Sequence, residues 1–344
     1  MSKLARVECF LSRITDPYTN LALEDWLFQQ KTASSYVLFL YRNSPSVIIG
    51  RNQNPWRECN LRLIKDHHVP LVRRRSGGGT VYHDLGNTNY SLMMPRQDFS
   101  RSRGVQLICR ALHQLDIPAS ENTRHDITIS DRKVSGSAFK IVNDRAYHHG
   151  TMLIHSNLSH LKQYLAKDAK SGLAGSSIQG RGVESIASPV TRLANHSLTI
   201  THLGFVEAVV DEFVKSFGGR DVTWSGLDYE RAATTAKGDV ELKVLDDEFI
   251  EEHEEVAEGA ESLKTWDWTF GQTPLFTHTL SPLSTAKGIV QATFTVDNGI
   301  IVDSAVTGLN AEIFKGQRYD ASSLETWTDT LDDDIMNWFK REIT

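Results

Sequence analysis

Apolar and polar positions along the first 245 residues follow patterns that predict both strands and helices. Val7, Cys9 and Leu11 alternate with more polar neighbours, which predicts a strand at the N-terminus. Apolar residues at helical spacing follow Asp16-Pro17, so a helix is predicted over 20–30. Further helices are predicted over 61–66, 104–115, 158–165 and 197–217, and further strands over 37–41, 47–50, 90–93, 126–130, 133–139 and 151–155. Strands and helices mixed in this order indicate an α+β protein.

Two segments interrupt the pattern and predict the domain organisation. Residues 170–189 are rich in Gly and Ser and poor in large apolar side chains, which predicts a long mobile loop. A dense run of acidic residues over 246–258 predicts a solvated helix face that leads into a linker. The apolar pattern resumes near residue 263. We therefore predict a large domain over 1–245, an acidic linker over 246–262 and a small C-terminal α+β domain over 263–344.

The small C-terminal domain has its own turn and helix signals. Asp297-Asn298-Gly299 separates two strand-like runs, 289–296 and 300–306, and this arrangement predicts a β-hairpin. A helix is predicted over 324–340. These elements give the segment enough structure to fold as a unit of strands and a closing helix.

Composition excludes several classes of protein. The 344-residue chain has a net charge of −6, so it does not have the overall charge of a polyanion-binding protein. Its three cysteines, Cys9, Cys59 and Cys109, have no zinc or thioredoxin-like spacing, and their small number favours a reducing compartment. No apolar run reaches the length of a membrane span. We therefore expect neither nucleic acid nor a membrane as partner.

The strongest candidate for chemistry is the stretch RRRSGGGTVYHD at 73–84. Three arginines run directly into Gly77, Gly78 and Gly79. Glycine allows a ligand to approach the backbone N–H groups closely, and arginine is suited to phosphate or carboxylate. The alternative is a basic surface turn before a strand. The pattern predicts an anion site, most plausibly for the phosphate of a nucleotide.

A second candidate is the stretch DRKVSGSA at 131–138, followed by YHHGTML at 147–153. Lys133 lies between apolar and small residues, and paired histidines begin the next strand-like run. Taken alone, Lys133 would be read as a solvated hairpin lysine. Together, RRRSGGGTVYHDLGNTNYS and DRKVSGSA…YHHGTML resemble the lipoate–protein ligase A family, part of the biotin/lipoate ligase group. NLALE at 20–24, GRNQNPW at 50–56 and WTFGQTP at 268–274 are similar to the same family in the same order.

The resemblance implies a fold, a reaction and a set of site residues. The implied fold is a large catalytic domain of mixed sheets and flanking helices with a small C-terminal domain. The implied reaction activates lipoate with ATP to lipoyl-AMP, then transfers the lipoyl group to a lysine. Lys133 would contact the lipoyl carbonyl and the phosphate in both half-reactions. The residues matching the family's nucleotide contacts are Arg74, Gly77, Gly78, Gly79, Thr80, Val81 and Tyr82. His149 and Gly150 would border the apolar lipoate tunnel with Lys133 at its reactive end.

The same resemblance leads to expectations about the metal ion, the acceptor proteins and the cellular compartment. Asp126 is the candidate ligand for Mg²⁺, and Asp84 is a second acid near the motifs; for both, a turn cap is the alternative. The implied acceptors are the lipoyl domains of 2-oxoacid dehydrogenase E2 subunits and the glycine cleavage H protein. We expect a mitochondrial location if the chain is eukaryotic, without a clear transit peptide, and a cytoplasmic location if it is bacterial. His83 and His148 are interpreted as packing or hydrogen-bonding histidines.

The chain departs from the family pattern at two places. His125-Asp126 stands where the family commonly has Asn-Asp, which bears on an adenylate contact. Pro189 stands where a family arginine is expected at the end of the adenylate-binding loop. That substitution resembles eukaryotic mitochondrial members, some of which only transfer a preformed lipoyl group.

Four other functions remain as alternatives to a complete ligase. The first is a lipoyltransferase that uses lipoyl-AMP or an acyl-CoA made elsewhere. A biotin ligase is disfavoured because its basic glycine-rich loop is absent, and a cysteine-dependent octanoyltransferase because no cysteine lies near Lys133 in the sequence. A binding or scaffold protein that kept the fold is disfavoured by the intact Arg74, Gly77–Gly79 and Lys133.

Overall fold

A seven-stranded mixed sheet lies at the centre of the large N-terminal part. The computed structural model describes residues 6–165, 177–218, 235–237, 240–286, 288–320, 323 and 331–343. The strand order is β10-β11-β6-β2-β1-β14-β13, in which β1 pairs in parallel with β2 and β14 and the other neighbours are antiparallel. The strands are β1 (Val7–Ser12), β2 (Tyr36–Tyr41), β6 (Asn87–Pro95), β10 (Ser137–Ile141), β11 (Arg145–Leu153), β13 (Thr235–Lys237) and β14 (Val240–Leu245).

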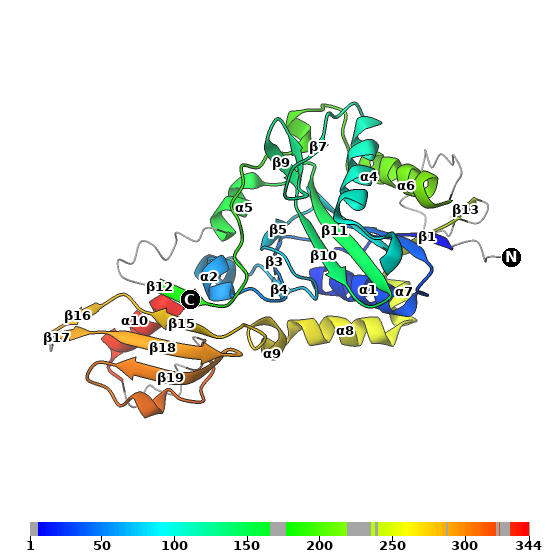
Figure 1. Cartoon of the computed structure of the whole chain (residues 1–344). Helices are drawn as coiled ribbons and strands as arrows, with labels where there is room; N and C mark the ends of the chain where they lie inside the picture. The colour runs from blue at the N-terminus through cyan, green and yellow to red at the C-terminus, as the bar shows by residue number, and fades with distance from the viewer. Residues whose placement is uncertain are drawn as a thin grey trace.

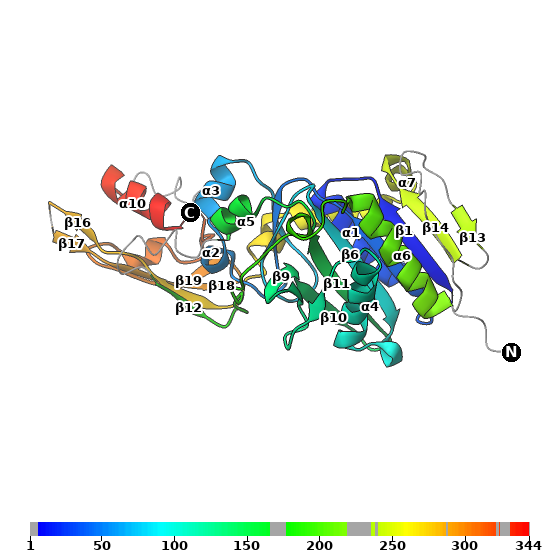
Figure 2. The same ribbon diagram turned by 90° about the horizontal axis from the view of Figure 1, so that it is seen from above.

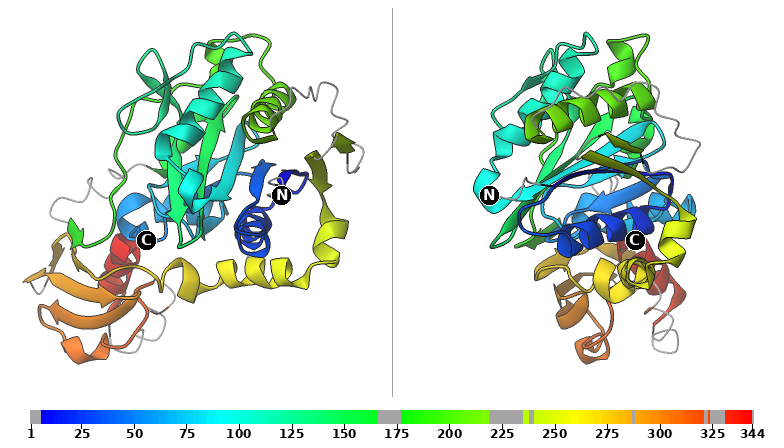
Figure 3. Two further views of the ribbon diagram at one scale, coloured as in Figure 1. Left: turned by 45° about the vertical axis from the view of Figure 1, so that its right-hand side comes forward. Right: turned by 90° about the vertical axis from the view of Figure 1, so that its right-hand side faces the viewer.

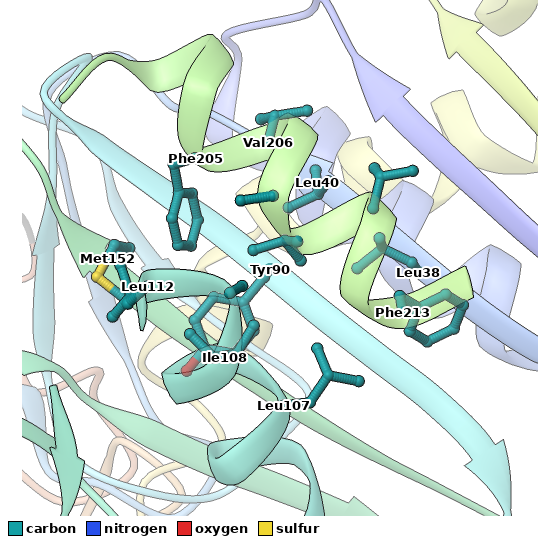
Figure 4. Packing of buried hydrophobic residues seen from close by; sticks show 14 of the residues in the cluster. Leu38, Leu40, Tyr90, Leu107, Ile108, Leu112, Met152, Phe205, Val206 and Phe213 are labelled. Carbon is teal, nitrogen blue, oxygen red and sulfur yellow. The ribbon is translucent and has the colours of Figure 1, made fainter. Parts of the chain in front are cut away.

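Helices cover both faces of this sheet, as Figure 3 shows. Helices α4 (Arg101–His113) and α6 (His202–Gly218) cover one face, and α1 (Pro17–Gln30) and α8 (Glu254–Lys264) lie on the other. Successive residues of β2 point to opposite faces, so Leu38 and Leu40 join the first core and Val37 and Phe39 join the second. Figure 4 shows Leu38, Leu40 and Tyr90 of the sheet packed against α4 and α6. Apolar burial on both faces accounts for the strongly hydrophobic strands.

Two small sheets beside the central sheet carry the candidate motifs. One has the order β4-β3-β5, formed by β3 (Ser46–Ile49), β4 (Leu71–Arg73) and β5 (Val81–His83). The other consists of β7 (Ser120–Glu121), β8 (Ile127–Ile129) and β9 (Arg132–Ser135). Short helices α2 (Pro55–Glu58), α3 (Leu61–Asp66) and α5 (Leu158–Tyr164) and the 3-10 turns η1 (Arg96–Asp98) and η3 (Leu193–Asn195) complete this part. The glycine run connects β4 to β5, and Lys133 lies in β9.

The C-terminal part forms a separate sheet at one end of an elongated molecule (Figure 2). Its order is β12-β15-β18-β19, with strands β12 (Ser177–Gly180), β15 (Phe276–Thr279), β18 (Ala292–Asp297) and β19 (Ile300–Val306). The small pair β16 (Leu283–Thr285) and β17 (Gly288–Val290), the turn η4 (Ala311–Ile313) and helix α10 (Asp333–Ile343) accompany it. The predicted hairpin is confirmed as β18–β19. Asn298 and Gly299 both have positive φ, 49° and 74°, as the tight hairpin turn requires.

One segment differs from its sequence-based expectation, and parts of two predicted elements lie outside the described residues. Within the predicted loop 170–189, Ser177–Gly180 is a strand that pairs antiparallel with β15, because its backbone donors and acceptors complete the exposed edge of the C-terminal sheet. Residues 170–176 of that loop lie outside the described residues. Of the predicted helix over 324–340, residues 333–340 belong to α10, and 324–330 lie outside the described part of the chain.

The acidic segment is helical and packs against α1. It contains α7 (Asp247–Glu251) and most of α8, and Figure 1 shows α8 running below α1 towards the C-terminal sheet. Val256, Ala260 and Leu263 recur at helical spacing and are buried against the α1 side of the core. The acidic side chains of α8 are exposed, which confirms a solvated helix face. The boundaries 1–245, 246–262 and 263–344 remain predictions.

Side chains of the large part enter the C-terminal core. Trp56 of α2 is fully buried among Phe270, Phe276 and Tyr319, with ring centroids 5.2–5.4 Å away. Helix α9 (Trp266–Thr269) connects α8 to that core. The two parts therefore share one apolar contact that is buried as deeply as a domain interior.

Within the described residues, no helix combines the length and the apolar character that crossing a membrane would require.

Candidate active site

The candidate motifs meet at one cavity of about 290 Å³. Strands β2, β3, β5, β6, β9, β10 and β11 contribute to its wall, together with the turn after β4 and residues 183–186. Nine of the residues expected to form the site line this cavity: Arg74, Gly78, Gly79, Thr80, Val81, Asp126, Lys133, His149 and Gly150. Residues more than 70 positions apart in sequence thus share one concave surface, as expected of a small-molecule site.

Two residues expected at the nucleotide, Tyr82 and Gly77, do not line the cavity. Tyr82 points to the opposite side of β5 from Val81 and His83, because side chains alternate along a strand. Its ring packs against Tyr164, with centroids 5.4 Å apart. Gly77 contributes its carbonyl oxygen, which accepts a hydrogen bond from Arg74 Nε at 3.1 Å. Gly77 therefore supports the glycine loop, and Tyr82 packs against α5, both from outside the cavity.

Arg74 shapes the glycine loop from within. Its guanidinium donates to the carbonyl oxygens of Gly77 and Gly79, the latter at 2.8 Å from Nη2, and to Ser76 Oγ at 3.0 Å from Nε. Gly78 has φ of 90°, and a Cβ there would lie 2.8 Å from Arg74 Nη2. Burial lowers the pKa of Arg74 to about 10, so the group stays cationic at neutral pH. Arg74 therefore places a buried positive charge beside the cavity while its donors hold the loop.

The other two arginines of the run have different partners. Arg73 is fully buried and donates to the carbonyl oxygens of Thr269, Arg51 and Gln53 at 2.8–3.0 Å, and to Thr273 Oγ1 at 2.9 Å. Arg75 pairs with Asp25 at 3.1 Å. Neither lines the cavity, so the idea that all three cations form one anion site is wrong: alternation along β4 sends Arg73 away from it.

The indole ring of Trp268 lies against two cations at the same junction. Arg51 and Arg75 approach this ring at 4.7 and 4.8 Å from its centroid. Trp268 Nε1 also donates to the carbonyl oxygen of Arg73 at 2.7 Å. The arginine run thus connects the C-terminal segment to the glycine loop.

Lys133 presents its ammonium to the cavity. Nζ lies 2.8 Å from Asp126 Oδ1, and the side chain is 23% exposed. A Cβ at Gly136 would lie 3.2 Å from Nζ, so the glycine leaves room for the lysine to pass. The backbone of Lys133 is held by Pro189 O and Thr191 N, each at 2.9 Å. The lysine is therefore fixed at both its backbone and its charged end.

The two candidate metal ligands have different surroundings. Asp84 accepts from the backbone N–H groups of Gly86 and Asn157 at 3.0 and 2.7 Å, and it does not line the cavity. Asp84 therefore caps a turn, which was the alternative interpretation of this residue. Asp126 is buried, and its Oδ2 has no hydrogen-bond partner among the described residues. Within the described ranges, no group of three or more His, Cys, Asp or Glu side chains is placed so that it could hold a metal ion.

The histidine expected at the lipoate tunnel belongs to a buried hydrogen-bonded chain. His149 Nδ1 lies 2.9 Å from Glu24 Oε1, and its Nε2 lies 2.8 Å from Ser76 Oγ. Ser76 Oγ in turn accepts from Arg74. Glu24, His149, Ser76 and Arg74 thus link α1 to the glycine loop, and Glu24 supplies a carboxylate near the buried guanidinium.

Apolar side chains and Gly150 form part of the remaining wall, beside polar residues such as Asn89 and Thr151. Leu21, Ile48, Val81 and Ala138 line the cavity beside Gly150. A Cβ at Gly150 would lie 2.3 Å from Tyr90 Oη, so only glycine allows β11 to pass this ring. An apolar wall leading to Lys133 is suited to an acyl chain whose carboxyl end reaches the charged groups.

Gln53 and Ser185 also belong to the site, although neither residue stands out chemically in the sequence. Gln53 Oε1 accepts from Gly50 N at 2.8 Å and from Thr80 Oγ1 at 2.9 Å. Ser185 Oγ lies 2.9 Å from Thr80 N. Gln53 lies within GRNQNPW, so only the resemblance could have directed attention to it. His125 points elsewhere: its Nδ1 lies 2.6 Å from Glu121 Oε1, and the residue does not line the cavity.

Buried histidines around the site predict an acid-sensitive fold. Burial lowers the pKa of His83, His148 and His202 from 6.5 to about 3. The unfolded chain therefore binds more protons than the folded chain between pH 6.5 and about 3, so stability falls as pH decreases through this window. Urea unfolding at several pH values measures the effect. We expect His148→Gln to flatten the dependence, and an unchanged slope would show that His148 does not contribute.

Comparisons with known proteins agree with this geometry. The sequence model of the lipoyl protein ligase A/B catalytic domain matches residues 16–214. A lipoate-protein ligase A of Psychrobacter cryohalolentis is 36% identical over 267 residues, which cover 78% of this chain and 73% of that protein. The crystal structure of P. falciparum LipL1 in complex with lipoate is similar with a TM-score of 0.61 and 27% identity, over 97% of this chain and 99% of that one. A bipartite lipoate protein ligase from Thermoplasma acidophilum, described with its E2 lipoyl domain, shares the fold at a TM-score of 0.58 and 20% identity, over 77% and 96% of the two chains.

Proposed function

Because this chain belongs to the lipoate–protein ligase family and is a ligase, we propose that it activates lipoate with ATP and transfers the lipoyl group to a lysine of an acceptor domain. The observation that carries the proposal is one cavity in which an apolar wall, the glycine loop and Lys133 Nζ converge. Each of these parts meets one requirement of joining a fatty acid to an amine.

Activation requires a carboxylate oxygen of lipoate to attack the α-phosphorus of ATP with loss of pyrophosphate. Negative charge gathers on the α-phosphate oxygens during this step. Three hydrogen-bond donors that line the same cavity can stabilise this charge. They are the backbone N–H groups of Gly79 and Thr80 and the ammonium of Lys133. Arg74 keeps the loop in its positive-φ shape and adds a buried cation. The proposed contribution of these residues is positioning and pre-organised charge.

Transfer requires the amine of the acceptor lysine to attack the acyl carbonyl of lipoyl-AMP. A carbon–nitrogen bond forms, the carbon–oxygen bond to AMP breaks, and the amine loses a proton. Lys133 Nζ would stabilise the carbonyl oxygen as it gains charge and the phosphate as it leaves. Asp126 positions Nζ through the 2.8 Å ion pair, so the lysine need not reorganise during the step.

Magnesium is proposed as the ion that accompanies ATP. Asp126 Oδ2 is the candidate ligand, because it is buried beside the cavity without a hydrogen-bond partner among the described residues, with Arg124 Nη2 in an ion pair at 3.8 Å. Mg²⁺ commonly binds one or two carboxylates and takes its other ligands from phosphates and water. The ion would neutralise phosphate charge in activation. No further carboxylate is needed for that mode of binding.

Lipoyl domains of 2-oxoacid dehydrogenase E2 subunits are the proposed acceptors, with the glycine cleavage H protein as a second. The archaeal ligase described with its E2 lipoyl domain supports the first choice by its shared fold. The chemistry of the site requires only an accessible lysine that can reach Lys133. Acceptor choice would therefore depend on surfaces around the mouth of the cavity.

A direct assay tests the function in two parts. The full chain is incubated with ATP, Mg²⁺, lipoate and an apo lipoyl domain, and the acceptor is weighed by mass spectrometry. We expect the mass of one lipoyl group, and lipoate-dependent exchange of pyrophosphate into ATP. Transfer from supplied lipoyl-AMP without exchange would assign the chain as a lipoyltransferase. No mass gain from either donor would contradict both functions.

A further inference from the structure

The glycine loop already holds an oxygen atom at the place where a ligand is expected. Ser185 Oγ accepts two hydrogen bonds, from Thr80 N and from Gln53 Nε2, each at 2.9 Å. A Cβ built on Gly79 would lie 3.2 Å from the same oxygen. The close approach that the glycine run allows is therefore used by a side chain of this protein.

The two donors belong to the scaffold and do not depend on Ser185 for their position. Gln53 is fully buried, and its Oε1 accepts from Gly50 N at 2.8 Å and Thr80 Oγ1 at 2.9 Å. The carbonyl oxygen of Gln53 also accepts from Arg73 at 2.8 Å. With Oε1 occupied by two donors, the amide group can only direct its Nε2–H donors towards Ser185 and Val183 O. The pair of donors is thus pre-organised.

Ser185 lies on a segment that is more exposed than the scaffold. Its neighbours Val183 and Ile186 are 46% and 67% exposed although both line the cavity. The segment is held by polar contacts at its backbone: Ser185 N donates to Glu58 Oε2, and Gly182 O accepts from Arg57 Nη2, at 2.9 and 2.8 Å. These contacts can remain while the Ser185 side chain rotates away from its two donors.

We propose that Gln53 Nε2 and Thr80 N form a donor pair for a phosphate oxygen of ATP, and that Ser185 Oγ occupies this place until the nucleotide displaces it. The inference rests on the proposed use of ATP by this site. Two N–H donors that converge on one oxygen beside a glycine can donate in the same way to an oxygen of a phosphate. Gln53 thereby becomes a nucleotide-binding residue, and Ser185 an internal competitor for the same donors.

Competition between Ser185 and ATP predicts the direction in which the affinity for ATP changes when the serine is replaced. ATP must replace two hydrogen bonds of the serine, so part of its binding free energy is cancelled. Removing the hydroxyl leaves the donors free for phosphate and should tighten binding. If Ser185 instead held the nucleotide, removing it would weaken binding. The direction of the change therefore separates the two roles.

Isothermal titration of the full chain with ATP and Mg²⁺, without lipoate, tests the inference. Ser185→Ala is expected to lower the dissociation constant of ATP about tenfold. Ser188→Ala is the matched control in the same segment, because Ser188 contacts Arg124 and neither donor, and it should leave the constant unchanged. An unchanged or raised constant for Ser185→Ala would overturn the competitor role.

Gln53 is tested in the Ser185→Ala background, where no serine competes. Gln53→Met keeps the volume but loses both the Nε2 donor and the Oε1 acceptor, and we expect about tenfold weaker ATP binding. Gln53→Glu retains the Oε1 acceptor for Gly50 and Thr80 and should weaken ATP binding further, since a carboxylate faces phosphate. Thermal unfolding checks that both variants fold. Binding as tight as in the parent would overturn the assignment of Gln53.

The outcome for the wild-type chain separates failure of this inference from failure of the proposed function. If wild type and Ser185→Ala both fail to bind ATP, the ATP-dependent half of the proposed function fails as well. If wild type binds ATP and the variants do not shift the constant, only the donor-pair inference fails. Lipoyl transfer to an acceptor is not used as a readout.

Discussion

Replacing Lys133 with alanine is expected to slow both activation and transfer about 100- to 1,000-fold, the usual cost of losing one pre-organised group that stabilises transition-state charge. Lys133 Nζ lies at the cavity wall, 2.8 Å from Asp126, with its backbone held on both sides. Single-turnover transfer from lipoyl-AMP and pyrophosphate exchange measure the two steps separately. Lys133→Arg should not restore either rate, because a planar guanidinium cannot take the position of a compact ammonium.

Lys140→Ala is the matched control for this prediction. Lys140 Nζ also forms a 2.8 Å ion pair, with Asp25, and its side chain is 24% exposed compared with 23% for Lys133. It lies on β10 and does not line the cavity. Losing its ion pair should affect stability alone. If the two alanine variants were equally active, Lys133 would be a structural lysine.

Replacing Trp56 with alanine is expected to lower the free energy of unfolding by about 3–5 kcal/mol, the typical loss for a large aromatic removed from a core. The indole is fully buried and packs against three rings of the C-terminal part. The empty volume would also lie next to residues 268–273, whose backbone Arg73 holds. Denaturant unfolding followed by tryptophan fluorescence gives the change, and Trp56→Phe should recover part of it.

A half-buried tryptophan elsewhere provides the comparison for Trp56. Trp26 on α1 is half-buried at the edge of a core, where its ring packs against Phe249 and His253. Trp26→Ala should therefore cost less stability than Trp56→Ala. A smaller loss for Trp56 than for Trp26 would show that the contact between the two parts is not a true shared core.

The C-terminal segment is connected to the nucleotide side of the cavity through two residues. Arg73 donates to Thr269 O and to Gln53 O, and the Gln53 side chain contacts Thr80 and Ser185. This continuous set of hydrogen bonds gives a physical route by which residues 266–273 support the glycine loop. We therefore expect the C-terminal part to assist activation more than transfer.

Local patterns were sufficient for elements whose structure depends on neighbours in sequence. Alternating apolar residues predicted β1, Asp16-Pro17 predicted the start of α1, and the Asp-Asn-Gly turn predicted the β18–β19 hairpin, because each signal acts through backbone preference over a few residues. The strand β12 was not predicted. Its Gly- and Ser-rich sequence has little intrinsic preference for a strand, and it is ordered by pairing with β15 nearly 100 residues away.

By itself the sequence determined which residue types were available for the reaction: a lysine between small residues, a glycine run beside arginines, and a family resemblance over nearly the whole chain. Only the tertiary structure decided how each was used. Strand alternation put Arg74 and Val81 beside the cavity and sent Arg73 and Tyr82 away from it. The β8–β9 hairpin put Asp126 beside Lys133, seven residues along the chain. Packing of distant segments brought Gln53 and Ser185 to Thr80. The contacts of Thr80 join residues far apart in the chain, and no local pattern encodes a distance that exists only after the sheets assemble.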